Sequence, residues 1–552
     1  MRILICHGYL LRGTGSNQYV QSLARALCQQ GHHLAVMCQE DDPRLDFVSA
    51  YLREEEGSLT PHTVWEKKTD YPGNCMVFKP EIGGLLPVYV LDSYPGFTVK
   101  EFTALDEIEL DWYVDRNRRS LDRLVEQFVP EVLHVNHAVM LPYIARPVAA
   151  KYDIPYFVSI HGSAIDFTVR KDSRYLPYGI DGLEGAKKIF VPSEHTEEQV
   201  IEVFGPALRG LEEKLTLLPP GVDTELFKPG ETDLRESVDT MMIGVRERSA
   251  GVRVGNFWSR SLEAREPRGA LQRLGDEIAR INSLHPEWMP DPELGVGMEW
   301  LVRRKSPFIM FLGKLLETKG IQCAIPAFPL VIREYPDARL VVVGFGELRG
   351  LLEMMIAALD DGEIGTFRRL CEYGNETYVD RMDDPFGPVL TFLEDLSGLG
   401  MLDDYVRVCY EYDLRDAIIF TGYLTPEEHR NLLPHARALL VPSLAQEAFG
   451  MVVTEAMASG VLPIASYHSG LETALEPMRT VWGSRAEQVM LGTREKVVSR
   501  IAEACNTVLG MPEAALALMG VEMRSIVKKC FSWEAAARRI VEYFEEASRN
   551  NR

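Results

Sequence analysis

Two glutamates lie close together in the sequence, on either side of a predicted helix start. Glu447 and Glu455 are separated by seven residues, Ala-Phe-Gly-Met-Val-Val-Thr. The backbone N–H groups at a helix start have no partners inside the helix and carry partial positive charge, so they favour a phosphate. Phe449, Gly450 and Met451 supply these groups, and the glycine lets a ligand approach the main chain closely. Two carboxylates beside such an anion site can accept hydrogen bonds from hydroxyl groups.

This combination suits a ligand with a diphosphate in its middle and a sugar at each end, which describes a nucleotide sugar. The surrounding pattern supplies the elements. The run Arg437–Val441 predicts a buried strand that Pro442 ends. The helix is predicted to start near Phe449 and to stop at Gly460, and Val461–Ala465 starts the next strand. The alternative is an ordinary strand, loop and helix whose two glutamates are only solvated.

The stretch Glu447–Glu455 resembles the paired-glutamate motif of retaining glycosyltransferases with two Rossmann-like domains, the GT-B fold. The closest resemblance is to the large family 4 of these enzymes, also called group 1. The resemblance implies that Glu447 meets the donor sugar hydroxyls and that Glu455 meets the nucleotide ribose. It implies no cofactor, because the nucleotide-diphosphate sugar is the substrate.

Two lysines follow another predicted buried strand, Phe308–Leu312. The segment Gly-Lys-Leu-Leu-Glu-Thr-Lys-Gly, which contains Lys314 and Lys319, resembles the family's Gly-Arg/Lys-Leu…Lys-Gly loop. Cations in this loop stabilise the negative charge that grows on a leaving diphosphate. Lys314 stands where the family more often has arginine, so the bidentate hydrogen bonding of a guanidinium to a phosphate is lost. The alternative is two solvated lysines.

The N-terminal strand Ile3–Cys6, a glycine loop and the helical pattern Tyr19–Leu27 predict a βαβ unit that opens a doubly wound domain. Its loop, Gly-Thr-Gly-Ser-Asn-Gln, resembles the family's Gly-Gly-x-Glu loop, which approaches the donor phosphate. It departs from that pattern, because Thr14 holds the first glycine position and Asn17 the usual glutamate. Gly15 is therefore a predicted donor-binding residue, with a plain strand-to-helix turn as the alternative.

A histidine follows the predicted strand Pro155–Ile160. Ligand crevices in open α/β sheets lie at such carboxyl ends of strands. The family has a histidine here that faces the donor sugar, so His161 joins Lys319 and Glu447 as a predicted catalytic residue. The alternative for His161 is a capping or core histidine.

The resemblance implies an α/β protein of GT-B fold, with two Rossmann-like doubly wound domains facing each other across a cleft and helical insertions. Residues 40–110 are irregular, acidic and proline-containing, and part of them is expected to be disordered or to form an acceptor-side flap. The predicted layout is an acceptor-side domain at 1–228, an insertion of unknown function at 229–305, a nucleotide-sugar-binding domain at 306–530 with an acidic helical insertion at about 351–413, and a helix at 531–552 that packs back on the first domain.

Composition narrows the classes of function. The chain has 552 residues and a formal net charge of −22, which argues against binding to nucleic acid or to an acidic lipid surface. No apolar run approaches the ~20 residues of a membrane span. The apolar start Met1–Cys6 runs into a glycine loop and lacks a signal-peptide cleavage site, so we expect a cytoplasmic protein. Nine cysteines show no Cys-x-x-Cys pair and no metal-ligand spacing, which predicts reduced thiols and no metal site.

The resemblance implies a retaining hexosyltransferase that moves a sugar from a nucleotide sugar donor to a sugar or small-molecule acceptor. Retention would come from same-face displacement or from a short-lived ion pair, and no metal is expected because the lysines and the helix start can neutralise the diphosphate. One alternative is a nucleotide-sugar epimerase on a similar fold, which acts without an acceptor. Another is a non-catalytic nucleotide-sugar-binding protein, although intact Glu447, Glu455 and Lys319 weigh against it. The base, the sugar, the acceptor and the oligomeric state are left open by the sequence.

Overall fold

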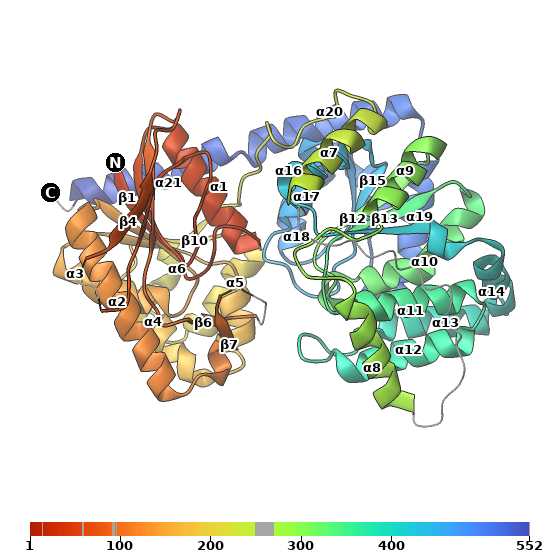
Figure 1. Cartoon of the computed structure of the whole chain (residues 1–552), viewed down its shortest axis with the longest axis horizontal. Helices are drawn as coiled ribbons and strands as arrows, with labels where there is room; N and C mark the ends of the chain where they lie inside the picture. Colours follow the sequence, from red (N-terminus) through yellow and green to blue (C-terminus); the bar gives the residue numbers. More distant parts are fainter. Residues whose placement is uncertain (14, 58–59, 91–93, 95, 249–269, 551–552) are drawn as a thin grey trace. The chain divides into compact units, whose positions relative to one another are not determined.

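The computed structural model describes residues 1–550 apart from residues 14, 58–59, 91–93, 95 and 249–269. The chain divides into two compact units. Unit 1 comprises Met1–Asp223 together with Phe531–Arg552, and unit 2 comprises Thr224–Cys530. Each unit is built around a sheet of its own (Figure 1).

Unit 1 has a nine-stranded sheet with the order β11-β10-β9-β8-β1-β2-β5-β3-β4. Neighbouring strands run parallel except β3 and β4, which are antiparallel. A separate two-stranded sheet pairs β6 with β7. The strands are β1 (Arg2–Cys6), β2 (His33–Met37), β3 (Val48–Arg53), β4 (His62–Glu66), β5 (Asn74–Lys79), β6 (Leu85–Val88), β7 (Thr98–Glu101), β8 (Val132–Asn136), β9 (Tyr156–Ser159), β10 (Ile189–Val191) and β11 (Leu215–Leu217).

The helices of unit 1 cover its main sheet because both faces of a parallel sheet must be shielded from water. They are α1 (Gly15–Gln29), α2 (Glu107–Phe128), α3 (Leu141–Lys151), α4 (Leu176–Glu184), α5 (Glu194–Phe204), α6 (Leu211–Lys214) and α21 (Trp533–Asn550), with short helical turns at Phe102–Ala104, Ile165–Val169 and Ser173–Tyr175.

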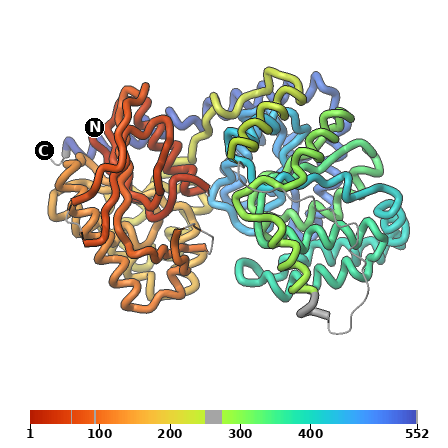
Figure 2. Tube along the Cα trace, viewed as in Figure 1, coloured from red at the N-terminus to blue at the C-terminus, as the bar shows by residue number. Residues whose placement is uncertain are grey.

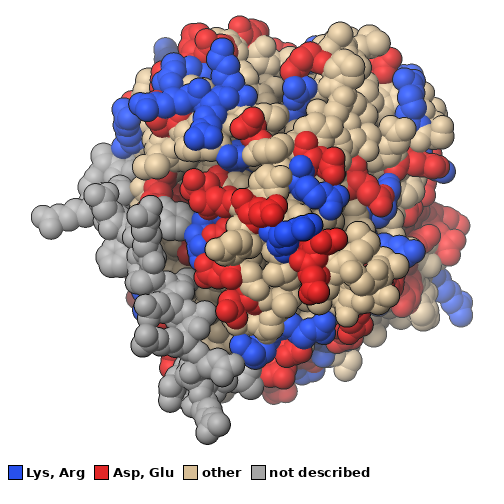
Figure 3. Space-filling view, turned by 90° about the vertical axis from the view of Figure 1, so that its right-hand side faces the viewer, with Lys and Arg blue, Asp and Glu red and all other residues tan. Residues whose placement is uncertain are grey.

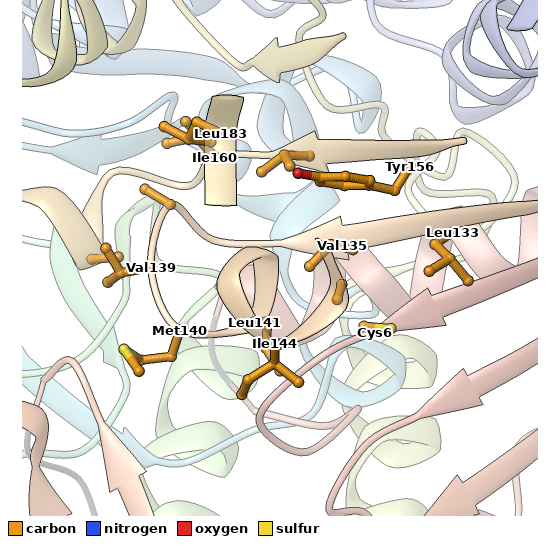
Figure 4. Close-up of a cluster of buried hydrophobic side chains, with 14 of the residues drawn as sticks. Cys6, Leu133, Val135, Val139, Met140, Leu141, Ile144, Tyr156, Ile160 and Leu183 are labelled. Carbon is orange, nitrogen blue, oxygen red and sulfur yellow. The ribbon is translucent and has the colours of Figure 1, made fainter. Parts of the chain in front are cut away.

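Strand β1 sends its side chains alternately to two hydrophobic cores, as the period of a strand requires. Leu4 and Cys6 belong to the first core. Ile3 and Ile5 belong to the second core, together with buried residues of α1 and of the C-terminal helix α21 such as Phe544. Helices α1 and α21 pack against each other, so the two ends of the chain meet within unit 1 (Figure 2). The first core also holds Leu133, Val135, Val139, Met140, Leu141, Ile144, Tyr156, Ile160 and Leu183, all labelled in Figure 4.

Residues 40–110 contain regular structure that the sequence did not predict. Strands β3, β4 and β5 add an edge to the main sheet, and β6 and β7 form the small sheet. The edge strand β4 is mostly exposed along its length, and β3 is only partly buried. Strands of this kind lack the continuous apolar run of a central parallel strand, so hydrophobic patterning does not reveal them.

Unit 2 has a six-stranded, fully parallel sheet with the order β14-β13-β12-β15-β16-β17. The chain moves outward from β12 to β14 on one side, then crosses back and moves from β15 to β17 on the other side. The loops after β12 and β15 therefore diverge at a topological switch point, where open α/β sheets bind ligands. The strands are β12 (Phe308–Leu312), β13 (Arg339–Val343), β14 (Ile418–Gly422), β15 (Ala438–Val441), β16 (Leu462–Ser466) and β17 (Met490–Leu491).

Helices surround the sheet of unit 2, and three of them precede its first strand. Helix α7 packs against α16, α8 against α11, and α9 against β14. The helices are α7 (Leu234–Arg248), α8 (Ala270–Ser283), α9 (Leu294–Arg304), α10 (Ile321–Glu334), α11 (Arg349–Asp360), α12 (Ile364–Thr377), α13 (Gly387–Gly398), α14 (Leu402–Glu411), α15 (Leu414–Ala417), α16 (Pro426–His429), α17 (Met451–Ala458), α18 (Gly470–Trp482), α19 (Val497–Leu509) and α20 (Glu513–Cys530), with short turns at Glu317–Lys319, Leu433–His435, Gly483–Gln488 and Arg494–Lys496.

The distribution of surface charge and the hydrophobicity of the long helices can be compared with the predictions from composition. Acidic and basic side chains are intermingled on the face shown in Figure 3, despite the formal net charge of −22. In the part of the chain that the structure describes, no single helix is long and apolar enough to cross a membrane. One bent pair, Arg494–Leu509 with Glu513–Cys530, meets the criteria of length and composition only when its two helices are taken together.

Candidate active site

The loops after β12 and β15 contact each other at the switch point of unit 2. The backbone N–H groups of Leu444 and Ala445 donate hydrogen bonds to the carbonyl oxygen of Thr318, at 2.9 and 3.2 Å. This approach depends on Gly320, which has a φ of +72°. A Cβ atom at Gly320 would lie 1.9 Å from the carbonyl oxygen of Pro442. The close packing of the two loops therefore requires a glycine at position 320 of the predicted lysine loop.

Lys319 and Glu447 form an ion pair across these two loops. The lysine Nζ lies 2.6 Å from Glu447 Oε1, and the hydroxyl of Ser443 donates to the same oxygen at 2.7 Å. The side chains of Lys319 and Glu447 are 36% and 18% exposed, so the pair is reachable by a ligand. A cation and a hydroxyl thus hold one oxygen of Glu447. Its other oxygen makes no hydrogen bond to any residue that the structure describes.

The backbone of Glu447 is fixed as well. Its N–H donates to Ser469 Oγ at 2.9 Å, and its carbonyl accepts from the N–H of Gly470 at 2.8 Å. His468 ties this loop to the rest of the site, with Nε2 at 2.8 Å from the Ser443 carbonyl and Nδ1 at 3.0 Å from Ser469 Oγ. Because a carbonyl only accepts, Nε2 carries the proton and Nδ1 accepts from the serine hydroxyl.

Three residues were therefore missed from the sequence: Ser443 and Ser469, which bond Glu447, and His468, which bonds both of these serine residues. Ser443 follows β15 after Pro442, and the other two follow β16. All three sit at the carboxyl edge of the sheet, so the strand-end argument that selected His161 also applies to them.

Helix α17 begins with an open N-terminus. Its N-cap is Gly450, with φ and ψ of +98° and +60°, and no side chain among the described residues caps it. A Cβ atom at Gly450 would lie 2.4 Å from Leu471 Cδ2, so packing also requires a glycine here. The side chain of Phe449 is only 3% exposed, and Met451 is the first helical residue. Uncapped N–H groups at a helix start favour an anion.

Glu455 differs from Glu447 in its surroundings. It lies four residues after Met451 on α17, hence on the same helix face. The carboxylate is half-buried and makes no hydrogen bond or ion pair with the described part of the chain. Burial raises its pKa to about 7. An unpartnered, partly desolvated carboxylate is costly to the fold, which is typical of a group kept for a ligand.

Lys314 lies at the other end of the lysine loop. Its Nζ is 5.7 Å from the ring centroid of Trp288 and 5.6 Å from that of Phe345. These are cation–π distances. Unit 2 therefore brings Lys314, Lys319, Glu447 and the start of α17 to the same edge of its sheet.

His161, in unit 1, follows β9 as predicted. Its Nε2 lies 2.9 Å from Asn136 Oδ1, and its ring contacts Tyr19 and His137 at centroid distances of 4.7 and 5.0 Å. Burial lowers the pKa of His161 to about 3, so the ring is neutral at physiological pH. His137, which follows β8, has both ring nitrogens buried without a partner in the described structure and a φ of +71°.

Gly15 is the first residue of α1 and is exposed. Nothing lies within 4 Å of a Cβ atom built on it, so packing does not require a glycine at this position. Asn17, at the family's glutamate position, is fully buried and is a structural amide. Its Oδ1 lies 2.9 Å from His7 Nε2, and its Nδ2 donates to the carbonyl of Arg12 at 2.7 Å. Thr14 lies outside the described residues.

Over the described ranges, no group of three or more His, Cys, Asp or Glu side chains is arranged to hold a metal ion.

Two protein-family models match the chain. Residues 14–221 match the glycosyl transferase 4-like domain, and residues 398–481 match the glycosyl transferases of group 1. An uncharacterized glycosyltransferase of Methanocaldococcus jannaschii is 24% identical over 182 residues, which is 33% of each chain. One from Bacillus subtilis is 34% identical over 76 residues, which is 14% of this chain and 21% of the relative. The matches thus span about a third and a fifth of these relatives.

Solved structures share the fold over the whole chain. Sucrose-phosphate synthase of Thermosynechococcus elongatus has a TM-score of 0.54 and 16% identity, covering 99% of this chain and 98% of the other. The catalytic domain of starch synthase IV of Arabidopsis thaliana, bound to ADP and acarbose, has a TM-score of 0.52 and 12% identity, covering 99% of each. The predicted GT-B fold class is confirmed, and the chain belongs to the group 1, family 4-like glycosyltransferases.

Proposed function

We propose that this protein is a retaining glycosyltransferase that transfers a sugar from a nucleoside diphosphate sugar to an acceptor. The observation that carries the proposal is the Lys319–Glu447 ion pair beside the uncapped start of α17. A lysine and the N–H groups of a helix start can bind a diphosphate, and a carboxylate oxygen next to them can accept hydrogen bonds from sugar hydroxyls. The ADP bound to the similar starch synthase IV supports a nucleotide donor.

The donor's diphosphate would contact the N–H groups of Gly450 and Met451 and the Nζ atoms of Lys319 and Lys314. Negative charge grows on the diphosphate as the bond from the sugar C1 to the phosphate oxygen breaks, and fixed cations stabilise that charge. Glu447 would accept hydrogen bonds from donor sugar hydroxyls through the oxygen that Lys319 leaves unused. Glu455, on the same helix face as Met451, would accept from the ribose hydroxyls.

Retention follows from attack on the same face of the sugar. The acceptor hydroxyl oxygen bonds to C1 on the face that the diphosphate leaves, the bonding electron pair goes to the leaving phosphate oxygen, and the hydroxyl proton passes to that oxygen. This route needs no enzymatic nucleophile and no metal, since lysines and the helix start neutralise the diphosphate. The predicted roles of His161 at the donor sugar and of Gly15 at the phosphate belong to the same proposal.

The acceptor in this proposal is a sugar or another small molecule, and the reaction takes place in the cytoplasm. The test is to incubate the protein with UDP-, GDP- and ADP-sugars, with and without sugar acceptors, and to follow products by NMR. We expect an α-linked product from an α-linked donor, formed only when an acceptor is present.

A matched pair of variants checks that the described site performs the reaction. Lys319→Ala should abolish most of the transfer, whereas Lys496→Ala, at an exposed lysine of the same unit, should not change it. Conversion of the donor sugar without an acceptor would indicate an epimerase instead. Binding without any turnover would indicate a binding protein.

A further inference from the structure

The residues between α8 and α9 lie on the carboxyl edge of the unit 2 sheet. Pro290 forms an antiparallel bridge with Gly422, the last residue of β14. The N–H of Asp291 donates to the Thr421 carbonyl at 2.7 Å, and the N–H of Tyr423 donates to the Met289 carbonyl at 2.8 Å. This insertion segment, residues 284–291, therefore continues the backbone pairing beyond β14.

Glycine makes this docking feasible. Gly422 has a φ of +68°. A Cβ atom there would lie 2.4 Å from the backbone nitrogen of Asp291 and 2.6 Å from the carbonyl oxygen of Met289. Strand β14 thus ends in a glycine, the only residue type that lets the insertion segment approach the strand's backbone so closely.

Arg248, the last residue of α7, fastens the segment from one side. It donates to the carbonyl of Trp288 and to the carbonyl of Tyr423, each at 2.9 Å. Its guanidinium also forms a bidentate pair with Glu428, at 3.0 and 2.8 Å. Both partner carbonyls belong to the contact between insertion and core, so the arginine holds the two sides of that contact together.

Ion pairs between two basic and two acidic side chains hold the insertion segment on its other side. His285 lies 3.1 Å from Asp291 and 3.0 Å from Glu353 of α11, and Arg349 lies 2.8 Å and 2.6 Å from the same two carboxylates. Arg349 and Asp291 are 8% and 5% exposed. Burial alone would lower the pKa of His285, but its two carboxylate partners raise it. Breaking one member of such a buried set leaves its partner charge unpaired, which is costly.

A cavity of about 180 Å³ lies between the insertion segment and the core. One side consists of insertion residues that include Met289 and Pro290. The other side consists of the loops after β12, β13 and β14, with Gly344, Gly346 and Leu315 among the lining residues. The insertion side offers the apolar Met289 and Pro290, the core side offers Leu315 and glycine backbone, and charged side chains that include Glu347 and Arg349 complete the lining. This mixture of apolar surface and hydrogen-bonding groups suits a heterocyclic base.

The cavity and the phosphate site share one loop. Leu315 lines the cavity, the preceding Lys314 lies over Trp288 of the insertion segment and over Phe345, and Lys319 holds Glu447. A diphosphate at Lys319 therefore has the cavity at the other end of the loop that binds it.

We propose that the insertion segment forms one wall of the pocket that receives the heterocyclic base of the donor nucleotide, and that Met289 and Pro290 help to select the base. The inference rests on the proposed nucleotide-sugar donor.

The test fills the cavity with a larger side chain from the insertion side. UDP, GDP, ADP and inorganic pyrophosphate are titrated calorimetrically into the wild type, into Met289→Trp and into Val296→Trp. Val296 is a matched control because it lies in the same insertion on α9 and is 73% exposed. We expect Met289→Trp to bind the preferred nucleoside diphosphate at least tenfold more weakly than the wild type does, with pyrophosphate binding unchanged. Val296→Trp should match the wild type for every ligand.

The outcomes separate this inference from the proposed function. A wild type that binds none of the nucleoside diphosphates more tightly than pyrophosphate overturns the donor itself. A wild type that prefers one nucleotide, together with an unaffected Met289→Trp protein, overturns only the role of the insertion.

Should Met289→Trp fail to fold, photolabelling of the wild type decides instead. An azido derivative of the preferred base is cross-linked and the labelled peptides are mapped by mass spectrometry. Label within residues 284–291 supports the inference, and label confined to other residues refutes it.

Discussion

The unpartnered carboxylate of Glu455 leads to opposite expected effects on stability and on binding. Replacing it with glutamine keeps the size of the side chain and removes the charge. Because no described residue compensates that charge, Glu455→Gln should make the free protein more stable. Because the charge is assigned to the ribose hydroxyls, the same change should weaken nucleotide binding.

The stability effect can be estimated from the pKa. Burial raises the pKa of Glu455 from its ordinary value of 4.5 to about 7. At about 1.4 kcal/mol per pKa unit, ionising the buried group costs the folded state up to about 3 kcal/mol. The cost is absent below pH 4.5, where the group is protonated in both states, and it grows as pH rises to about 7. The glutamine variant should therefore match the wild type at pH 4.5 and exceed it at pH 8.

The assay is calorimetric unfolding at the two pH values. For a unit of the length of Thr224–Cys530, 3 kcal/mol corresponds to a Tm increase of roughly 5 °C. Glu376→Gln, at an exposed position on α12, is the control and should show no pH-dependent gain. An equal Tm difference at both pH values, or none at either, would refute the reasoning that Glu455 carries a desolvated charge.

Nucleotide binding provides the second readout. Losing a charge-assisted hydrogen bond should weaken the binding of the preferred nucleoside diphosphate by about 1.5–3 kcal/mol. Since only the ionised form is the full acceptor, wild-type affinity should fall about tenfold between pH 8 and pH 6. The glutamine variant should lack that part of the pH dependence. A variant that gains stability and binds normally would show that Glu455 does not contact the ligand.

Three further outcomes are expected. Lys319→Ala should lower kcat at least ~100-fold, because its charge matters most as the diphosphate leaves. The circular dichroism spectrum of this variant should match that of the wild type. A near-normal kcat would show that Lys319 is only a solvated surface charge. Transfer activity should persist in EDTA, and an absolute need for Mg²⁺ or Mn²⁺ would contradict the role given to the lysines. Gly320→Ala should destabilise the protein by more than ~1 kcal/mol in chemical denaturation, because alanine is strained at positive φ and its Cβ would meet the Pro442 carbonyl; wild-type stability would contradict this packing argument.

Local patterning predicted the elements of the unit 2 site. Strand β12 is a continuous apolar run, and β15 is another that Pro442 ends, so buried parallel strands and their loops could be located from the sequence. The same reasoning placed Lys319 and Glu447 at strand ends. It could not show that they touch, because their contact joins residues 128 positions apart.

Other features depend on tertiary contacts that leave little trace in the local sequence. Strand β4 is exposed and lacks the apolar alternation of a half-buried strand. His468 follows a different strand from Ser443, and only the assembled sheet brings its ring to the Ser443 carbonyl, 25 residues away. The insertion segment docks through Arg248, whose partner Glu428 lies 180 residues away. Pairings at such separations are set by the assembled sheet and not by neighbouring residues.

The Lys319–Glu447 pair also bears on how the reaction cycle ends. In the free protein the lysine is already neutralised by an internal carboxylate at 2.6 Å. At the proposed donor site a diphosphate would compete with Glu447 for the cation, so it would bind more weakly than beside a lysine that has no internal partner. The same competition would act on the nucleoside diphosphate product, because the Glu447 carboxylate would pair with Lys319 again as that product leaves. The internal anion would thus limit product inhibition and return the site to its starting state.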